Sequence, residues 1–293
     1  MPLGALALVI LAGLIHASWN IVAKKAGGDS RFAAFTSLVM MVFWAPLGIW
    51  LGVQQVPGWG RNEWLLLAAS AVAHTLYYVI LLRGYRKADL TVVYPLARGS
   101  GPLLASIAAI VLLGEHITAT GALGIAGVVA GVFLVAGGPG LWRASHDPLR
   151  RERVRKGMFY GVLSGAFIAG YTVIDGYAVK VLLLSPILVD YIGCLLRLVL
   201  LAPSFVRDLP AAGVMWRSQW KYAMYVGIIS PVSYVLVLYA MQTAPLSHVA
   251  PAREVSMLFA AIIGGQLLGE GDRLLRLAGA ACIAAGVMAL ALG

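Results

Sequence analysis

Residues 90–115 read LTVVYPLARGSGPLLASIAAIVLLGE, and residues 246–270 repeat the pattern as LSHVAPAREVSMLFAAIIGGQLLGE. In both stretches a proline precedes an arginine, a long apolar run follows, and Gly-Glu closes the unit. Each run is long enough to cross a bilayer, which takes roughly 20 mostly apolar residues. The chain is therefore predicted to contain a duplicated membrane-spanning unit.

The similarity between the two halves extends beyond these stretches, and equivalent residues are separated by a nearly constant number of positions in the sequence. Trp64 and Trp220 are 156 residues apart, and Arg98 and Arg253 are 155 apart after the loss of one residue. The match is clearest over the last three predicted helices of each half and poorest in the first. The halves are thus expected to share a scaffold, and their differences are where we expect substrate choice to reside.

Composition places most of the chain in lipid. Its 293 residues are 61% hydrophobic and 12% charged, whereas soluble domains are about 45–50% apolar and about 25% charged. We predict an all-α polytopic membrane protein with ten transmembrane helices in one transporter domain. The expected helices cover residues 3–23, 32–52, 64–84, 89–113, 117–137, 157–179, 185–206, 219–242, 246–268 and 274–292.

The predicted helices divide into two repeats of five. The first repeat covers residues 1–138, a linker covers 139–156, and the second repeat covers 157–293. Copies with an odd number of crossings must insert upside down relative to each other. Inverted repeats are typical of secondary transporters, which bind substrate at the interface of the repeats.

The distribution of lysine and arginine predicts the topology. Loops after the odd-numbered helices, the linker among them, hold seventeen of the 22 basic residues, and the other side holds only Arg61 and Lys180. Basic loops stay cytoplasmic, so we expect both termini outside an inner membrane. The bias reverses between the two copies, which independently indicates inversion. The net charge of +10 is then a consequence of topology, and no nucleic-acid partner is expected.

Three arginines lie inside predicted spans, and two of them are repeat equivalents. Arg98 and Arg253 each follow a proline, which removes a backbone donor from the helix. We expect interrupted helices at these points, with hinge elements at Pro95, Gly99, Pro102 and Pro251. A charge within a span usually faces a cavity or a partner. These arginines are predicted either to coordinate an anion such as a substrate carboxylate or to form a structural ion pair.

Several helices carry polar and aromatic residues on one face. His16, Trp19 and Asn20 have helical spacing, as have His74, Tyr77 and Tyr78. Such faces suit an amphipathic organic substrate, and the alternative is hydrogen bonding between helices. The remaining candidates for a substrate cavity are Tyr94, Arg98, Tyr171, Asp175, Ser230, Tyr234, Arg253 and Glu254.

The acidic residues within the predicted spans do not identify which group binds a coupling ion. Asp175, Asp190 and Glu254 lie in spans, and any of them, or His16 or His74, could carry a coupling proton. We interpret Asp190 as a member of a structural pair. Glu254 adjoins Arg253, but neighbouring side chains on a helix point apart.

Other sequence features are interpreted as structural. Glu115 and Glu270 end their helices and are expected to cap the start of the next helix, with participation in a gate as the alternative. The glycine-rich helices five and ten indicate either close packing or the seam of a homodimer. The two cysteines lie in apolar runs, and neither a metal site nor a cofactor is expected.

The motifs resemble those of the EamA-type drug/metabolite transporters. The resemblance is carried by the two-repeat layout, the run His16–Asn20, the run Tyr94–Arg98, and the closing Leu-Leu-Gly-Glu of both repeats. It implies secondary transport of small metabolites, often amino-acid export, through a central cavity between the repeats. Many relatives have both termini cytoplasmic, whereas the charge bias here predicts the opposite.

We therefore expect an exporter of amino acids that works by alternating access. The alternative is a carrier of other solutes, such as drugs, organic anions, sugars or phosphorylated metabolites. A membrane-embedded enzyme is disfavoured because no dense polar cluster stands at ligand spacing on one helix. A scaffold without transport would not need polar-aromatic faces in both repeats.

Overall fold

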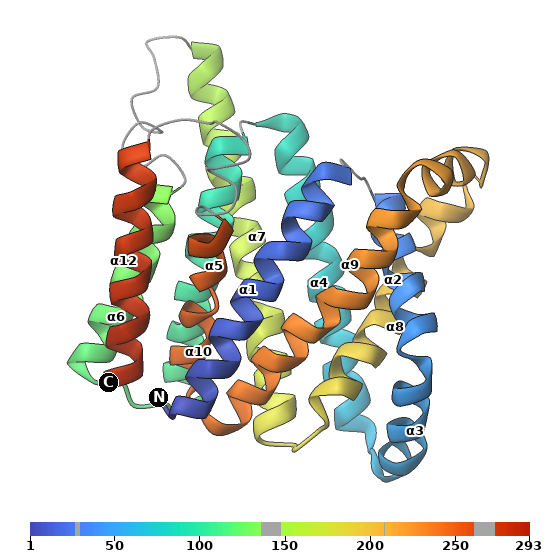
Figure 1. The fold of residues 1–293 in the computed structure, drawn as a ribbon, viewed down its shortest axis with the longest axis horizontal. Coiled ribbons are helices and arrows are strands. Elements are labelled where there is room, and N and C mark those ends of the chain that lie inside the picture. Colours follow the sequence, from blue (N-terminus) through green and yellow to red (C-terminus); the bar gives the residue numbers. More distant parts are fainter. Residues whose placement is uncertain (27–29, 89, 136–147, 208, 261–272) are drawn as a thin grey trace.

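The computed structural model describes residues 1–26, 30–88, 90–135, 148–207, 209–260 and 273–293 (Figure 1). All regular structure in these ranges is helical. The helices are α1 (Leu3–Ala26), α2 (Ser30–Phe43), α3 (Ala45–Gln55), a 3₁₀ turn (Val56–Gly58), α4 (Arg61–Lys87), α5 (Leu90–Leu113), α6 (Ala119–Val135), α7 (Pro148–Lys180), α8 (Pro186–Val206), α9 (Leu209–Thr243), α10 (Leu246–Ala252) and α12 (Arg273–Leu292).

Six helices in the described ranges are long and apolar enough to cross a membrane. They are α1, α4, most of α5 and α7, the first part of α8, and α9. The bent pair of α2 and α3 would make a seventh span. Helix α6 and residues 277–292 are apolar but shorter. Each of the ten predicted segments coincides with a helix or a helix pair as far as the chain is described, but length alone supports only six or seven crossings.

The second predicted helix is not continuous. Helices α2 and α3 meet at Trp44 with a bend of 68°. Pro46 stands in the first turn of α3, where its missing N–H costs no intrahelical bond. The span expected over 32–52 therefore corresponds to a bent helix pair rather than to one continuous helix.

The helices that carry the repeat-equivalent prolines Pro95 and Pro251 behave differently. Helix α5 runs unbroken from Leu90 to Leu113 through Pro95, Gly99 and Pro102, so the expected interruption there was wrong. Neighbouring helices can compensate for the single backbone bond that a proline removes. Helix α10, in contrast, ends at Ala252, and residues 253–254 form a turn before the chain becomes helical again over 255–260.

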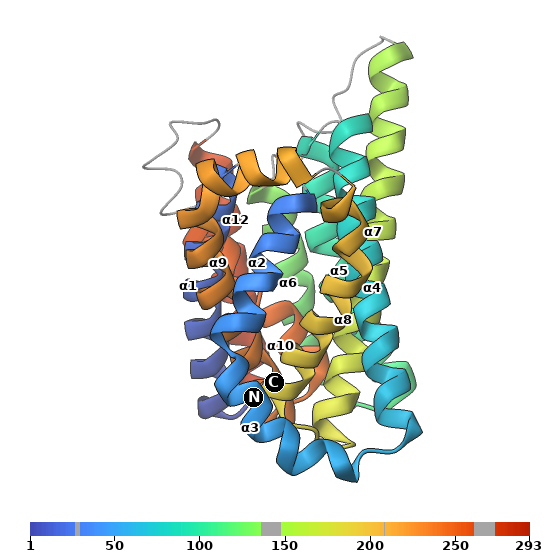
Figure 2. The ribbon, with the colours of Figure 1, turned by 90° about the vertical axis from the view of Figure 1, so that its right-hand side faces the viewer.

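Helix α7 begins earlier than predicted. It starts at Pro148 rather than near residue 157, so part of the expected linker is helical. This amino-terminal part projects beyond the rest of the bundle (Figure 2). Residues 139–147 of the linker lie outside the described residues.

The helices of the two halves pack reciprocally. Helix α1 packs on α9 as α7 packs on α4, and α2 packs on α9 as α8 packs on α4. The equivalent pairs α2 with α8, α5 with α10 and α6 with α12 are also in contact. These equivalent pairs thus make corresponding contacts in the two halves, as expected for a duplicated unit.

Glycines allow α6 and α12 to approach closely. A Cβ added at Gly131 would lie 2.6 Å from the carbonyl oxygen of Gly279, and one at Gly286 would lie 2.6 Å from the amide nitrogen of Val128. The glycine-rich faces therefore meet inside the chain. This favours the packing interpretation over the dimer seam.

Both termini lie at one end of the molecule (Figures 1 and 2). The Met1 ammonium donates a hydrogen bond to the carbonyl oxygen of Ala291 at 2.9 Å. The carboxyl ends of α1 and α4, which carry Lys24, Lys25, Arg86 and Lys87 in their last turns, lie at the opposite end (Figure 1). The fold thus separates these basic residues from the termini.

Candidate functional site

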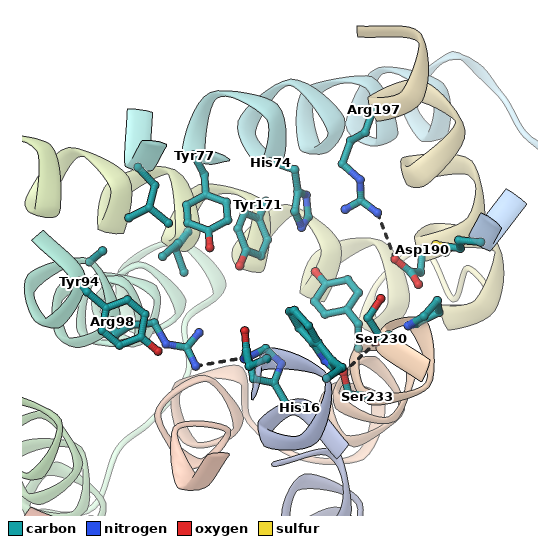
Figure 3. Close-up of a pocket in the computed structure, with 18 residues that line it drawn as sticks. His16, His74, Tyr77, Tyr94, Arg98, Tyr171, Asp190, Arg197, Ser230 and Ser233 are labelled. Atoms are coloured by element: carbon teal, nitrogen blue, oxygen red, sulfur yellow. Dashed lines mark hydrogen bonds and ion pairs between the residues drawn. The ribbon is translucent and has the colours of Figure 1, made fainter. Parts of the chain in front are cut away.

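A central cavity of about 250 Å³ opens between helices of both halves (Figure 3). Helices α1, α2, α4 and α5 supply one part of its lining, and α7, α8 and α9 supply the other. Its lining residues are His16, Trp19, Asn20, Met40, His74, Tyr77, Leu81, Tyr94, Ala97, Arg98, Ile168, Tyr171, Asp190, Arg197, Ser230, Pro231, Ser233 and Tyr234.

The structure brings most of the predicted site residues to this cavity. The predicted residues that line it are His16, Trp19, Asn20, His74, Tyr77, Tyr94, Arg98, Tyr171, Ser230 and Tyr234. Tyr78 and Asp175 are not among its lining residues. Arg253 and Glu254 instead line a smaller adjoining pocket of about 60 Å³, together with His16 and Arg98.

Aromatic rings form one wall of the cavity. His74 stacks on Tyr171 with ring centroids 3.6 Å apart and an interplanar angle of 20°. The rings of Tyr77 and Tyr234 lie 6.0 and 6.4 Å from that of Tyr171. The i, i+3 spacing of His74 and Tyr77 places both rings on the same side of α4. The wall offers ring faces to the apolar parts of a ligand.

Arg98 lies on one side of the cavity and contacts the residues that follow α10. Its Nε lies 3.2 Å from Glu254 Oε2, and its Nη2 donates to Ser256 Oγ at 3.3 Å and lies 3.4 Å from His16 Nε2. Glu254 is only 1% exposed. The arginine is therefore anchored by partners on α1 and on the chain after α10.

Glu254 also pairs with its neighbour in sequence. Arg253 Nε lies 3.7 Å from Glu254 Oε1. We expected adjacent side chains to point apart, but that expectation assumed a continuous helix. The turn at 253–254 changes the directions of both side chains and was not evident from residue spacing.

A second ion pair lies on the opposite side of the cavity, and sequence reasoning did not place it in the site. Arg197 Nη2 lies 3.4 Å from Asp190 Oδ1, two turns away on α8 (Figure 3). Both residues line the cavity. Asp190 was interpreted as structural because residue spacing within one helix does not reveal which other helices, or which cavity, that side of the helix contacts. The presence of Arg197 inside a predicted span was the signal that could have found the pair.

Asp175 lies behind the aromatic wall. It is 2% exposed, and its Oδ2 accepts a hydrogen bond from the Tyr234 hydroxyl at 2.5 Å. Its Oδ1 has no hydrogen-bond partner among the described residues.

A second hydrogen bond orients a ring of the cavity from the first half. Trp19 Nε1 donates to Ser233 Oγ at 3.2 Å across the α1–α9 contact. These bonds hold cavity-lining rings of both halves in place.

Glu115 connects the two halves at the end that carries the termini. Its Oε1 accepts hydrogen bonds from the Leu246 amide at 2.8 Å and from Lys180 Nζ at 3.0 Å, and its Oε2 accepts one from the Ser247 amide at 2.8 Å. We expected Glu115 to cap the next helix in sequence. It caps α10 of the other half instead, while Glu270 lies outside the described residues.

The environment of Glu115 favours its charged form. Burial raises the pKa of this carboxyl, but the amides of Ser247 and Leu246, the Ser247 hydroxyl and Lys180 outweigh burial and hold the pKa below its ordinary value. The contact between the halves is therefore charged at neutral pH.

The described side chains do not form a metal centre. In the parts of the chain that the structure describes, no group of three or more His, Cys, Asp or Glu side chains is placed to hold a metal ion. The cavity instead combines ring faces with the Asp190–Arg197 pair and with Arg98, whose partner Glu254 lines the adjoining smaller pocket. That combination suits a small organic ligand with both apolar and charged groups.

Comparison with solved structures supports the fold. One crystal structure of a protein superposes on 100% of this chain and 98% of its own, with a TM-score of 0.76 and 16% sequence identity. At this identity the likeness concerns the fold alone. No curated protein sequence matches the chain significantly.

Comparison with protein families confirms the resemblance that the sequence motifs indicated. Residues 3–137 and residues 155–292 each match the EamA-like transporter family. The two matches together cover nearly the whole chain, and the family is one of transporters rather than enzymes. The chain therefore belongs to the EamA-like transporter family and is a multi-pass membrane transporter of small molecules.

Proposed function

We propose that this chain is a secondary transporter that exports amino acids or similar small zwitterions. The observation that carries the proposal is a cavity between the halves that is lined by Arg98, by the Asp190–Arg197 pair and by an aromatic wall. An arginine offers paired donors to a carboxylate, a carboxylate accepts from an ammonium group, and the rings accommodate apolar atoms. Arg98 and Arg197 are the arginines that line this space.

The proposed architecture is ten spans in two inverted repeats, residues 1–138 and 157–293. The reciprocal packing of equivalent helices supports this arrangement. An even number of crossings agrees with termini at the same end of the molecule. The positive-inside rule then places the termini outside an inner membrane.

The proposed mechanism is alternating access, in which one repeat rocks against the other around the cavity. The Glu115 contact closes the end that carries the termini, because it joins the loop after α5 to α7 and α10. The turn after Pro251 is a hinge element that moves Arg253 and Glu254 with α10. Pro95, Gly99 and Pro102 are the matching hinge elements in α5.

A flux measurement tests the proposal. The purified chain is reconstituted into liposomes, and efflux and uptake of a panel of labelled amino acids are measured with and without a pH gradient. Flux above empty liposomes for at least one amino acid supports the proposal. Flux equal to that of empty liposomes across the whole panel contradicts it.

Arginines in the cavity also favour a second candidate, a carrier of organic anions. The same liposomes distinguish the two candidates through competition. Simple organic anions would block flux more strongly than zwitterions if the substrate were an anion. Zwitterions would compete better if the carboxylates Asp190 and Glu254 take part in binding.

A further inference from the structure

A second pocket adjoins the central cavity beside Asp190. It has a volume of about 200 Å³ and lies where α2, α8 and α9 meet. Met40, Asp190 and Pro231 line both spaces and therefore lie at their boundary. The residues lining the second pocket are Met40, Trp44, Ile187, Asp190, Tyr191, Pro231, Val232, Val235 and Leu236.

This pocket is apolar except at Asp190. Its two polar rings are bonded to neighbouring backbone: Trp44 Nε1 donates to the carbonyl oxygen of Ile228 at 3.2 Å, and the Tyr191 hydroxyl donates to that of Met41 at 3.2 Å. These bonds satisfy the polar atoms of both rings and leave apolar ring surface for the pocket. The remaining lining is aliphatic, so the pocket suits a hydrocarbon or aromatic group.

Asp190 retains hydrogen-bonding capacity at the boundary of the two spaces. It is 5% exposed, its Oδ1 lies 3.4 Å from Arg197, and its Oδ2 has no hydrogen-bond partner among the described residues. A buried carboxylate oxygen normally has a partner. In the other pair Arg98 Nε and Glu254 Oε2 also lack a hydrogen-bond partner among the described residues, but Glu254 lines the smaller pocket instead of the cavity, and Arg98 has Glu254, Ser256 and His16 around it. The Asp190–Arg197 pair is thus the pair whose arginine and carboxylate both line the central cavity.

We infer that the transported amino acid binds with its charged head at Asp190 and Arg197 and its side chain in the apolar pocket. This inference rests on the proposed function and specifies its substrate class. The ammonium group meets Asp190 Oδ2, and the carboxylate meets the Arg197 guanidinium. The substrates are then amino acids with large apolar side chains, such as phenylalanine or leucine.

The size of the pocket agrees with this class. An apolar cavity of about 150 Å³ is large enough to hold benzene, so about 200 Å³ accommodates a phenyl or a branched aliphatic group. Met40 lies between the two spaces, and its unbranched side chain adapts to different shapes more easily than a branched one. The occupant is the substrate rather than a lipid chain because Asp190, the charged residue of the pocket lining, also lines the cavity.

The test compares phenylalanine with alanine flux in proteoliposomes. Val235→Phe on α9 and Ile187→Phe on α8 each fill the pocket from a different helix. Burial of a large apolar side chain favours binding by about 10- to 100-fold. Either variant is therefore expected to lower the ratio of phenylalanine to alanine flux by about tenfold or more. Val199→Phe is the matched control, because Val199 is on α8 but 63% exposed, and its ratio should equal that of the unchanged chain.

Asp190→Asn tests the head-group contact. The unchanged chain is expected to prefer phenylalanine over 3-phenylpropionate, which lacks the ammonium group. In the variant the ratio of phenylalanine flux to 3-phenylpropionate flux should fall about tenfold, since a neutral amide no longer pairs with the ammonium group. A purely structural role of Asp190 would lower the flux of both compounds alike and leave the preference unchanged, which would overturn the assignment.

The possible failures are distinguishable. Absence of any amino-acid flux in the unchanged chain refutes the proposed function and, with it, this inference. Amino-acid flux whose phenylalanine-to-alanine ratio is unaffected by both pocket-filling variants refutes the inference alone. Loss of a co-purified lipid from those variants, with the ratio unchanged, would assign the pocket to a lipid chain. Elution of each variant as a single species on size exclusion shows that it is folded.

Discussion

Glu115→Gln should open the end of the molecule that carries the termini. Glu115 is the carboxylate that joins the α5–α6 loop of the first half to Lys180 on α7 and to the first two amides of α10. Glutamine has nearly the same shape but no charge. It retains one carbonyl oxygen for one of the α10 amides and loses the interaction with Lys180.

The magnitude follows from the bonds that are lost. A hydrogen bond to a charged group contributes about 1.5–3 kcal/mol, and a neutral one about 0.5–1.5 kcal/mol. The substitution removes two charged bonds and weakens the third. The Lys180 side chain is 34% exposed, so hydration of its ammonium group compensates for much of the lost interaction with Glu115. We expect the closed arrangement to lose about 2–3 kcal/mol, which is roughly a 30- to 150-fold shift toward the open one.

The assay measures the labelling of a buried cysteine at this end. Cys194 and Cys282 are first replaced by serine, and Ala244→Cys is introduced, because Ala244 is 2% exposed and its carbonyl oxygen accepts a bond from Lys180. A membrane-impermeant maleimide should label this cysteine about 30-fold faster or more when Glu115→Gln is present. Glu63→Gln is the matched control, since Glu63 bonds only to the Gly60 amide at the start of its own helix, α4.

Two results would refute the reasoning. Unchanged labelling with Glu115→Gln would show that the carboxylate does not hold this end closed, and equal acceleration by Glu63→Gln would show a nonspecific effect. The pH dependence provides a further check. Because the pKa of Glu115 is held below the ordinary 4.5, its contribution is complete above that value and is lost as the pH falls through the lowered pKa. Labelling of the Ala244→Cys chain that retains Glu115, divided by that of a freely exposed cysteine at the same pH to correct for the falling thiolate fraction, should therefore rise only in acid.

Three other substitutions test the packing around the cavity through thermal unfolding in detergent. Arg98→Ala removes the nearer cation from Glu254, which is 1% exposed, and should destabilise the fold by about 3–5 kcal/mol; Arg98→Ala combined with Glu254→Gln should recover part of this loss. Gly131→Ala places a Cβ 2.6 Å from the Gly279 carbonyl oxygen and should lower the unfolding temperature through a cost of about 1–3 kcal/mol, whereas Gly170→Ala on α7, where no atom lies within 4 Å, should not lower it. Tyr234→Phe removes the hydrogen bond to Asp175 and should cost about 1–3 kcal/mol, while Tyr239→Phe on the exposed face of α9 should cost less than about 0.5 kcal/mol; equal effects of the two tyrosine changes would contradict the reasoning.

Helix positions were predictable because hydropathy is a local property of the chain. Each expected segment coincides with a helix as far as the chain is described, and the expected face of His74 and Tyr77 lines the cavity. Helix continuity was less predictable. Pro46 accompanies a bend of 68° between α2 and α3, yet Pro95 and Pro102 leave α5 unbroken. Whether a proline breaks a helix depends on neighbouring helices, which residue spacing does not describe.

The sequence by itself determined the membrane class, the duplication, the family and the residue types that line the cavity. These properties depend on composition and on patterns within single helices. The tertiary structure decided which partners meet: Glu115 caps α10 of the other half, and Arg98 pairs with Glu254 across 156 residues of sequence. It also turned the Asp190–Arg197 pair toward the cavity and placed an apolar pocket beside it. Contacts between helices depend on where the helices cross, and a crossing is a property of the packed bundle rather than of any one segment.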